Sequence, residues 1–298
     1  MGRKICYCCS HIRNYIVRLI LTGGTGFLGK YLTESLLKSG AEVLSLIRSK
    51  QNINTTHDKQ LLVKEYEIGG KDSLPKEISN DFDTIVHLAW NDITDVNSDR
   101  HVNEYLPQHL DFLKKIIDRG VKNVFVLGTC YEYGMCNGMI NESHETLPIT
   151  KYGIAKKRLS HELLAFQKKT DFNITWARLF YVYGKGQISS TIYKQLHEAI
   201  KNREKIFKMS NGDQLLDYLS VDQVTDILTN LILCKKPNLG FINVCNGSPI
   251  RLIDLVENWI NESGQSIDLD LGAYPYREFE PKSFWGDRKY LNQILNLK

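Results

Sequence analysis

A short apolar segment near the start of the chain leads into three glycines spaced three residues apart. Residues 16–21 are apolar except for Arg18, and Gly23, Gly26 and Gly29 follow within the segment TGGTGFLG. From residue 28 onward, leucines recur at the spacing of one helix face. The order of strand, glycine turn and helix predicts a helix N-terminus that attracts a diphosphate through free N–H groups and the helix dipole. A purely structural turn is the alternative, but the flanking strand and helix favour a dinucleotide site.

Apolar segments and helical patterns then alternate. Further strands are expected at 41–47, 61–66, 82–89 and 123–127, and long helices at about 97–118 and 150–168. This alternation predicts an α/β fold with a doubly wound parallel sheet. Ligands of such sheets bind at the carboxyl ends of the strands, so one edge is expected to gather the glycine turn, Arg48, Ala89, Trp90 and Thr129.

Arg48 follows the second expected strand, where NAD-binding sites usually carry an acidic residue that binds the ribose. An arginine at this position suits the 2′-phosphate of NADP instead. The sequence therefore predicts a preference for NADP(H), with NAD(H) as the other possible cofactor. In that alternative, Arg48 is a surface charge and an acidic residue elsewhere binds the ribose.

Tyr152 and Lys156 stand four residues apart at the start of an expected helix, and Thr129 ends the preceding strand. Residues four apart share one helix face. A neighbouring ammonium favours the phenolate, so we expect a lowered pKa for Tyr152 and a role as general acid or base. The Thr129 hydroxyl can bind the same substrate oxygen. This set suits hydride and proton transfer at a carbinol or carbonyl carbon.

At this point the chain resembles the extended short-chain dehydrogenases/reductases, the NAD(P)-dependent epimerase/dehydratase group that acts on nucleotide sugars. The matching segments are TGGTGFLG (22–29), HLA (87–89), GTCYEYG (128–134), YGIAK (152–156), ARLFYVYGKGQ (177–187), DYLSVDQV (217–224) and NVCNGSPI (243–250). The resemblance implies a Rossmann domain, residues 16–180 plus about 215–245, and a smaller discontinuous substrate-binding domain, about 181–214 plus 246–298. It implies Thr129, Tyr152 and Lys156 as the catalytic set, with Lys156 on the nicotinamide ribose.

The cofactor-binding residues expected from the motif and the resemblance lie on this edge of the sheet. They are Gly23, Thr25, Gly26, Phe27, Leu28, Gly29, Arg48, Leu88, Ala89, Trp90, Tyr152 and Lys156. Trp90 either lines the nicotinamide or sugar pocket or packs in the core. His87 is expected to make a structural hydrogen bond.

The expected substrate-binding residues are Cys130, Tyr131, Tyr181 and Arg277. Tyr181 stands where relatives usually carry Asn, and Leu216 where many carry Arg. Arg277 is a candidate for the missing charge, because an Arg fork fits a diphosphate, although an exposed loop Arg is the alternative. Cys130 is either a further acid/base or a small buried hydrophobe.

The resemblance implies one of three reactions at the sugar: dehydration, reduction of a 4-keto group or 4-epimerisation. Dehydratase relatives carry Asp-Glu directly after the catalytic Thr, whereas Cys130 and Tyr131 follow Thr129 here, which argues against dehydration. Arg48, and the likeness of residues 273–287 to enzymes that reduce dTDP-4-keto-6-deoxyhexoses, favour an NADPH-dependent 4-ketoreductase of deoxysugar or surface-polysaccharide (O-antigen) biosynthesis. A nucleotide-sugar 4-epimerase with tightly bound NAD is the alternative, and a non-catalytic NADP-binding module is the second.

Composition limits the partners and the compartment. A formal net charge of +4, with opposite charges interspersed, gives no reason to expect nucleic acid, and no apolar stretch is long enough for a membrane span. Seven scattered cysteines suit a reducing cytoplasm. Cys6, Cys8 and Cys9 match no zinc spacing, so no metal is expected, and residues 1–15 are expected to be a flexible basic extension.

A homodimer is expected, since relatives pair the helices that correspond to 97–118 and 150–168. The first of these helices carries apolar residues that one sheet contact does not obviously need. They are Val102, Leu106, Leu110, Leu113, Ile116 and Ile117. The alternative is that the sheet of the same chain buries all of them.

Overall fold

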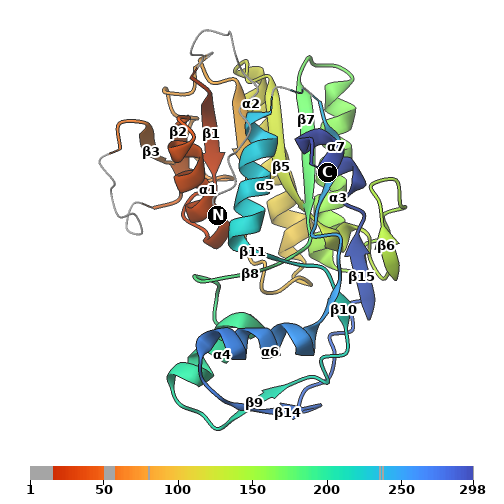
Figure 1. Cartoon of the computed structure of the whole chain (residues 1–298). Coiled ribbons are helices and arrows are strands. Elements are labelled where there is room, and N and C mark those ends of the chain that lie inside the picture. The colour runs from red at the N-terminus through yellow and green to blue at the C-terminus, as the bar shows by residue number, and fades with distance from the viewer. Residues whose placement is uncertain (1–15, 50–57, 80, 235, 237, 298) are drawn as a thin grey trace.

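A seven-stranded sheet with the strand order β12-β7-β5-β4-β1-β2-β3 is the main element of the computed structural model, which describes residues 16–49, 58–79, 81–234, 236 and 238–297 (Figure 1). Every neighbouring pair in it is parallel, which confirms the predicted Rossmann-like α/β fold. Its strands are β1 (Arg18–Thr22), β2 (Glu42–Ile47), β3 (Leu61–Glu65), β4 (Thr84–His87), β5 (Asn123–Thr129), β7 (Asn173–Leu179) and β12 (Gly240–Val244).

Helices cover both faces of this sheet (Figure 1). One apolar cluster joins a sheet face to α1 (Phe27–Lys38), α5 (Val221–Leu233) and α7 (Lys289–Leu295). A second cluster joins the other face to α2 (Leu106–Asp118) and α3 (Lys151–Gln167). The helix expected at 97–118 begins as a π-helical turn, η2 (His101–Tyr105), that runs into α2.

A smaller unit lies beyond the carboxyl ends of the large sheet's strands (Figure 1). Its core holds α4 (Ile192–Lys201), α6 (Leu252–Ser263), β9 (Ile206–Met209) and β14 (Asp268–Leu271). The remaining elements join the two units. They are η3 (Cys130–Glu132), β6 (Gly138–Ile140), β8 (Tyr181–Tyr183), β10 (Leu215–Leu216), β11 (Tyr218–Ser220), β13 (Ile250–Arg251) and β15 (Ser283–Gly286).

The division into two domains remains a prediction, but one helix lies outside its predicted domain. The predicted substrate-binding domain includes residues 246–298, whereas Leu291 and Ile294 of α7 are buried in the apolar cluster of the large sheet. The chain therefore returns to the Rossmann unit at its end. The basic extension, with Cys6, Cys8 and Cys9, lies outside the described residues.

The apolar residues that suggested a dimer are mostly buried within one chain. Leu106, Leu113, Ile116 and Ile117 are at most 5% exposed and belong to the cluster beneath the sheet. The apolar face of this helical segment is therefore mostly covered by its own chain, and the homodimer remains a prediction. Within the described ranges, no helix has the length and apolarity that a bilayer crossing requires.

Asp217 ties the segments between the two units together. It lies between β10 and β11, is fully buried, and accepts hydrogen bonds from the backbone N–H groups of Asn246 at 2.6 Å, Gly247 at 2.9 Å and Gly286 at 3.2 Å. A buried carboxylate is stable only when its oxygens are satisfied in this way.

We expect Asp217→Asn to lower the free energy of unfolding by about 1–3 kcal/mol, because the amide NH2 group would face a backbone N–H and leave it unpaired. Urea denaturation measures this change. Asp226→Asn is the matched control, since Asp226 is exposed on α5, and should change the value by less than about 0.5 kcal/mol. Equal effects of the two substitutions would contradict the role of Asp217.

Candidate active site

The glycine turn has the close backbone contacts that the sequence predicted. Gly23 has φ +78°, and the Gly26 N–H donates to the Gly23 carbonyl at 3.0 Å just before α1 begins. A Cβ on Gly23 would lie 2.8 Å from the Ala89 nitrogen, and a Cβ on Gly29 would lie 2.0 Å from the Gly23 oxygen. The turn, the start of α1 and the end of β4 can therefore approach one another only with glycine at these positions.

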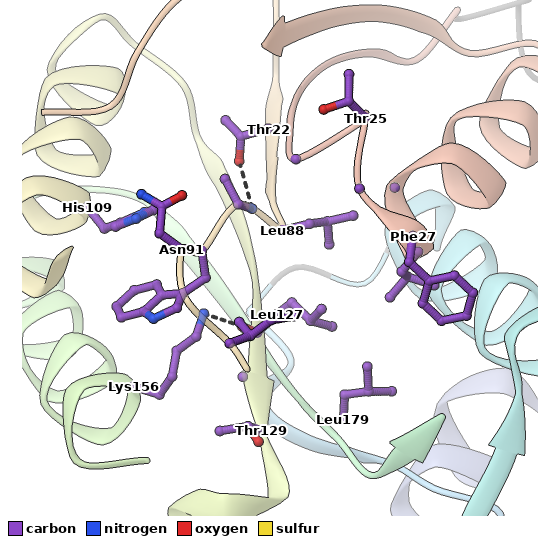
Figure 2. A pocket seen from close by; sticks show the side chains of 18 of the residues that line it. Thr22, Thr25, Phe27, Leu88, Asn91, His109, Leu127, Thr129, Lys156 and Leu179 are labelled. Carbon is purple, nitrogen blue, oxygen red and sulfur yellow. Dashed lines mark hydrogen bonds between the residues drawn. The ribbon is translucent and has the colours of Figure 1, made fainter. Parts of the chain in front are cut away.

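A pocket of about 730 Å³ lies along the carboxyl edge of the sheet, in front of this turn (Figure 2). All twelve residues predicted to bind the cofactor line it. The pocket runs from Arg48 and the glycine turn past Ala89 and Trp90 to Tyr152 and Lys156. The diphosphate of a dinucleotide fits a turn of glycines at which an added Cβ would collide, next to a free helix N-terminus.

Thr129, Tyr152 and Lys156 meet at one end of this pocket. Thr129 is the last residue of β5, and the Thr150 hydroxyl caps α3 by accepting from the Gly153 N–H at 3.1 Å. Tyr152 and Lys156 follow on the first turns of α3, and a hydrogen bond joins the Tyr152 and Thr129 side chains. The predicted trio is thus brought together.

Lys156 is held away from the expected position beside the phenol oxygen. Its buried Nζ donates to the Leu127 carbonyl at 2.8 Å and lies 4.3 Å from the centre of the Trp90 ring (Figure 2). Burial lowers the pKa of Lys156 to about 7. Cations over indole rings are stabilised by the ring quadrupole.

The expected lowering of the Tyr152 pKa was wrong for this structure. Burial raises the pKa of the Tyr152 phenol, the charge of Glu132 raises it further, and only the hydrogen bond with Thr129 lowers it. Desolvation disfavours the phenolate, and the ammonium of Lys156 is turned toward Leu127 rather than toward the phenol oxygen. Proximity of a lysine and a tyrosine along a helix is therefore not sufficient to lower the pKa of the tyrosine.

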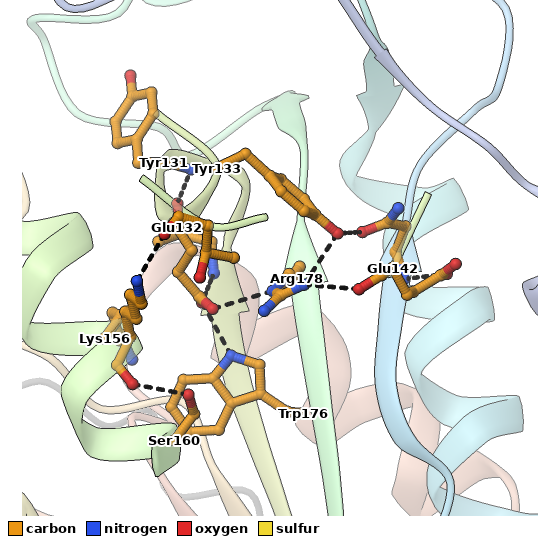
Figure 3. Close-up of polar contacts among 12 residues, drawn as sticks. Tyr131, Glu132, Tyr133, Glu142, Lys156, Ser160, Trp176 and Arg178 are labelled. Atoms are coloured by element: carbon orange, nitrogen blue, oxygen red, sulfur yellow. Dashed lines mark hydrogen bonds and ion pairs between the residues drawn. The ribbon is translucent and has the colours of Figure 1, made fainter. Parts of the chain in front are cut away.

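Glu132 points away from the pocket into the core (Figure 3). It is fully buried, and its carboxylate accepts from the Thr129 N–H at 2.9 Å, Trp176 Nε1 at 2.8 Å and Arg178 Nε at 2.9 Å. Glu132 is therefore not among the residues that line the first pocket. Its contacts instead fix the backbone that presents Thr129.

A second pocket, of about 840 Å³, lies between the sheet and the small unit. It contains Arg277 and shares Tyr131 and Tyr181 with the first pocket, so the two spaces meet at these tyrosines. Cys130 is buried and lines only the first pocket, and burial raises the pKa of its thiol, which disfavours a role as acid or base. Leu216 is buried in the core.

Residues 19–244 match the model of the family described as "NAD dependent epimerase/dehydratase family". The chain belongs to this family. Among curated relatives, dTDP-6-deoxy-L-talose 4-dehydrogenase (NAD(+)) of Aggregatibacter actinomycetemcomitans is 26% identical over 275 residues, which cover 91% of this chain and 99% of the relative. Probable UDP-arabinose 4-epimerase 3 of Arabidopsis thaliana is 24% identical, with 95% and 79% covered.

Solved structures of the epimerase/dehydratase family share the fold. UDP-N-acetylglucosamine 4-epimerase from Methanobrevibacter ruminantium M1 superposes with a TM-score of 0.81 at 22% identity, covering 94% of this chain and 92% of that one. UDP-glucuronic acid 4-epimerase from Bacillus cereus, in complex with UDP-glucuronic acid and NAD, gives 0.80 at 20% identity, covering 95% and 94%. Relatives of this chain are thus named as nucleotide-sugar epimerases and dehydrogenases, and the chain is an NAD(P)-dependent oxidoreductase or epimerase.

In this family member, Trp90 both lines the pocket and packs in the core. Its ring stacks on that of His109 with centres 4.5 Å apart, and its Nε1 donates to His101 at 3.0 Å. His87 makes the expected structural bonds, to Thr22 at 2.8 Å and to His109 at 2.8 Å. His101 and His109 were not predicted from the sequence, although both lie on the helical segment expected to pack under the sheet.

Arg48 lies at the end of β2, exposed, at the rim of the first pocket. The acidic Glu67, which follows β3, lines the same pocket. The edge therefore carries both the predicted arginine and a carboxylate of the kind that binds a ribose. No group of three or more His, Cys, Asp and Glu side chains arranged for a metal occurs among the described residues.

We expect Gly23→Ala to weaken NAD(P) binding at least about 10-fold, because the added Cβ would collide with the Ala89 backbone and displace the turn. Gly40→Ala is the matched control, since Gly40 has φ +83° but a Cβ there would meet nothing within 4 Å. Calorimetric titration of both variants with NAD and NADP measures the effect. Similar affinities for the two variants would contradict the assignment of the turn.

Lys156 should make stability depend on pH. The pKa of its ammonium is about 7 in the folded chain and about 10.4 in an unfolded one. Between these values the unfolded chain binds one more proton, so stability rises with pH. Above pH 7, the free energy of unfolding of the wild type should therefore rise by up to about 1.4 kcal/mol per pH unit more than that of the Lys156→Met variant. Denaturation curves that stay parallel from about pH 6 to pH 9 would rule this out.

Proposed function

We propose that this protein interconverts the 4-keto and 4-hydroxy forms of a nucleotide-diphosphate 6-deoxyhexose, as a 4-ketoreductase and, in reverse, a 4-dehydrogenase. The observation that carries the proposal is the meeting of Thr129, Tyr152 and Lys156 in the first pocket, next to Tyr131, which lines both pockets. The dTDP-6-deoxy-L-talose 4-dehydrogenase that covers 91% of this chain, and the GDP-6-deoxy-D-talose 4-dehydrogenase that covers 94%, support it by name.

The proposed cofactor is NAD(H), with NADP(H) as the alternative. Arg48 favours NADP(H), but the same pocket also carries Glu67, and both side chains are exposed. Glu67 in the same pocket suits the hydroxyls of an unphosphorylated ribose. The 26%-identical relative is named for NAD(+), which also supports this choice.

In this proposal the turn of Gly23 to Gly29 binds the cofactor diphosphate, and Lys156 binds the nicotinamide ribose. The bound cofactor supplies or accepts the hydride at C4 of the sugar. Tyr152 donates a proton to the C4 oxygen during reduction and takes it back during oxidation. The Thr129 hydroxyl, which accepts from the Tyr131 N–H at 3.2 Å, donates to the same oxygen and stabilises its developing charge.

The proposed place of the substrate is the second pocket, with the sugar at the junction. Cys130, Tyr131 and Tyr181 surround the junction. Arg277 lines the second pocket and is the proposed partner of the substrate diphosphate. This arrangement brings C4 of the sugar to Tyr152 while the nucleotide extends toward the small unit.

A nucleotide-sugar 4-epimerase is the second candidate, favoured by the UDP-arabinose 4-epimerase relatives that cover 94–95% of this chain. An epimerase oxidises and re-reduces the same carbon, so it needs no external coenzyme during turnover. The two candidates therefore differ in whether coenzyme is consumed.

We expect the protein to oxidise NADH when it is supplied with dTDP-4-keto-6-deoxyglucose, and the loss of NADH absorbance measures this reaction. A parallel reaction with NADPH tests the preference for NADP(H) predicted from Arg48. Conversion of 4-hydroxy epimers without net coenzyme use, together with NAD retained through purification, would establish the epimerase instead. Tight coenzyme binding with no turnover of any nucleotide sugar would indicate the non-catalytic module.

Tyr152→Phe should reduce kcat at least about 100-fold, because it removes the proton donor, while NAD(H) affinity stays within about 3-fold, because the ring and Lys156 remain. Tyr290→Phe is the control, since the Tyr290 hydroxyl donates to the Leu239 carbonyl away from the pocket. Near-normal turnover of Tyr152→Phe would remove Tyr152 from the proposed role.

A further inference from the structure

Glu280 places a nearly buried carboxylate at the inner end of the second pocket. Its side chain is 12% exposed, and it accepts a hydrogen bond from the Tyr131 hydroxyl at 3.1 Å and from Arg277 Nη1 at 3.3 Å. Both contacts fall on Oε1. Oε2 has no partner among the described residues, so it is left as an acceptor.

This carboxylate stands close to the proposed reacting centre. Tyr131, its hydrogen-bond partner, directly follows Cys130 and Thr129 in the chain, and the Tyr131 ring centre is 6.5 Å from that of Tyr152. Burial raises the pKa values of Tyr131 and Tyr181, which line both pockets, and the charge of Glu280 raises both further. A pyranose ring that presents C4 to Tyr152 therefore lies within reach of Glu280.

The pocket around Glu280 also contains an unused hydrogen-bonding group. The Tyr181 hydroxyl is buried and has no hydrogen-bond partner among the described residues. Its ring lies 6.4 Å from that of Tyr131 and 5.3 Å from that of Tyr218. A buried hydroxyl without a partner is costly, and the Tyr181 side chain that carries it lines both pockets.

Arg277 does not cancel the charge of Glu280 inside the pocket. The Arg277 side chain is 59% exposed, so water screens its charge, whereas the carboxylate is nearly buried. The two residues are three apart in the segment 277–280, and their polar ends meet at one carboxylate oxygen. Arg277 thereby orients Glu280 without blocking Oε2.

We propose that Glu280 determines which sugars this enzyme accepts: its carboxylate binds a hydroxyl or amino donor of the hexose and excludes sugars that carry a carboxylate. This inference rests on the proposed function, because it takes the pocket to hold the sugar of a nucleotide sugar. Like charges placed close together repel, so the exclusion follows from electrostatics rather than from size. Two of the solved relatives are complexes with UDP-glucuronic acid, so the fold itself accommodates acidic sugars.

UDP-glucose and UDP-glucuronic acid form a matched pair of probes, because they differ only in a hydroxymethyl or carboxylate group at C5. Calorimetric titration of the NAD-loaded enzyme gives the Kd of each, and their ratio cancels the contribution of the nucleotide. We expect the wild type to bind UDP-glucose at least about 10-fold more tightly, and Glu280→Gln to reduce that ratio at least about 10-fold, mainly through tighter binding of UDP-glucuronic acid.

Glu278→Gln is the control, since Glu278 is exposed in the same segment and the variant changes the net charge equally. It should leave the ratio at the wild-type value. The same ratio in wild type and Glu280→Gln, with both ligands bound, would overturn the assignment of Glu280 and leave the proposed function standing. Failure of the wild type to bind any nucleotide sugar would overturn the proposed function and this inference with it.

Glu280→Gln keeps the side-chain length and an oxygen that can accept from Tyr131, so its fold should persist. Thermal unfolding with and without NAD checks this directly. A second variant, Glu280→Ala, should also lose the discrimination against UDP-glucuronic acid, and should weaken UDP-glucose binding because the acceptor is gone. Retained discrimination in the alanine variant would likewise contradict the proposal.

Discussion

The buried ion pair of Glu132 and Arg178 is the interaction on which the site depends. Arg178 comes from β7, and its guanidinium also donates to the Tyr133 hydroxyl at 3.0 Å and lies 4.3 Å from the centre of the Phe241 ring. Glu132 in turn holds the Thr129 N–H. Removing one partner of such a pair leaves an uncompensated buried charge. The pair therefore joins the carboxyl end of β7 to the end of β5, where the chemistry is proposed to occur.

The network continues outward from that pair toward the edge of the large sheet (Figure 3). The Tyr133 hydroxyl donates to Asn243 at 2.7 Å, and the Asn243 N–H donates to Glu142 at 2.8 Å. Asn243 lies on β12, at the far edge of the sheet. Side-chain hydrogen bonds thus link strands that are also paired through their backbone hydrogen bonds. A rigid edge of this kind keeps reacting groups at fixed positions.

Much of the fold and of the proposed site was predictable because the responsible signals are local. The glycine spacing requires a tight turn, the alternation of apolar strands and amphipathic helices requires a parallel sheet, and carboxyl ends of parallel strands meet at one edge. These rules placed Thr129, Tyr152 and Lys156 around one pocket. The predicted roles of these residues await the experiments above.

The Rossmann-like sheet, the glycine turn and the residues at the sheet edge follow from the order of residues, since each depends on neighbours along the chain. Properties that depend on distant neighbours and on burial emerge only in the folded protein. The Tyr152 phenol has a raised pKa because packing removes water from it, and Lys156 turns to the Leu127 carbonyl. Glu280 meets Tyr131 across 149 residues of sequence. No local spacing encodes desolvation or such a contact, because both arise only when the units pack together.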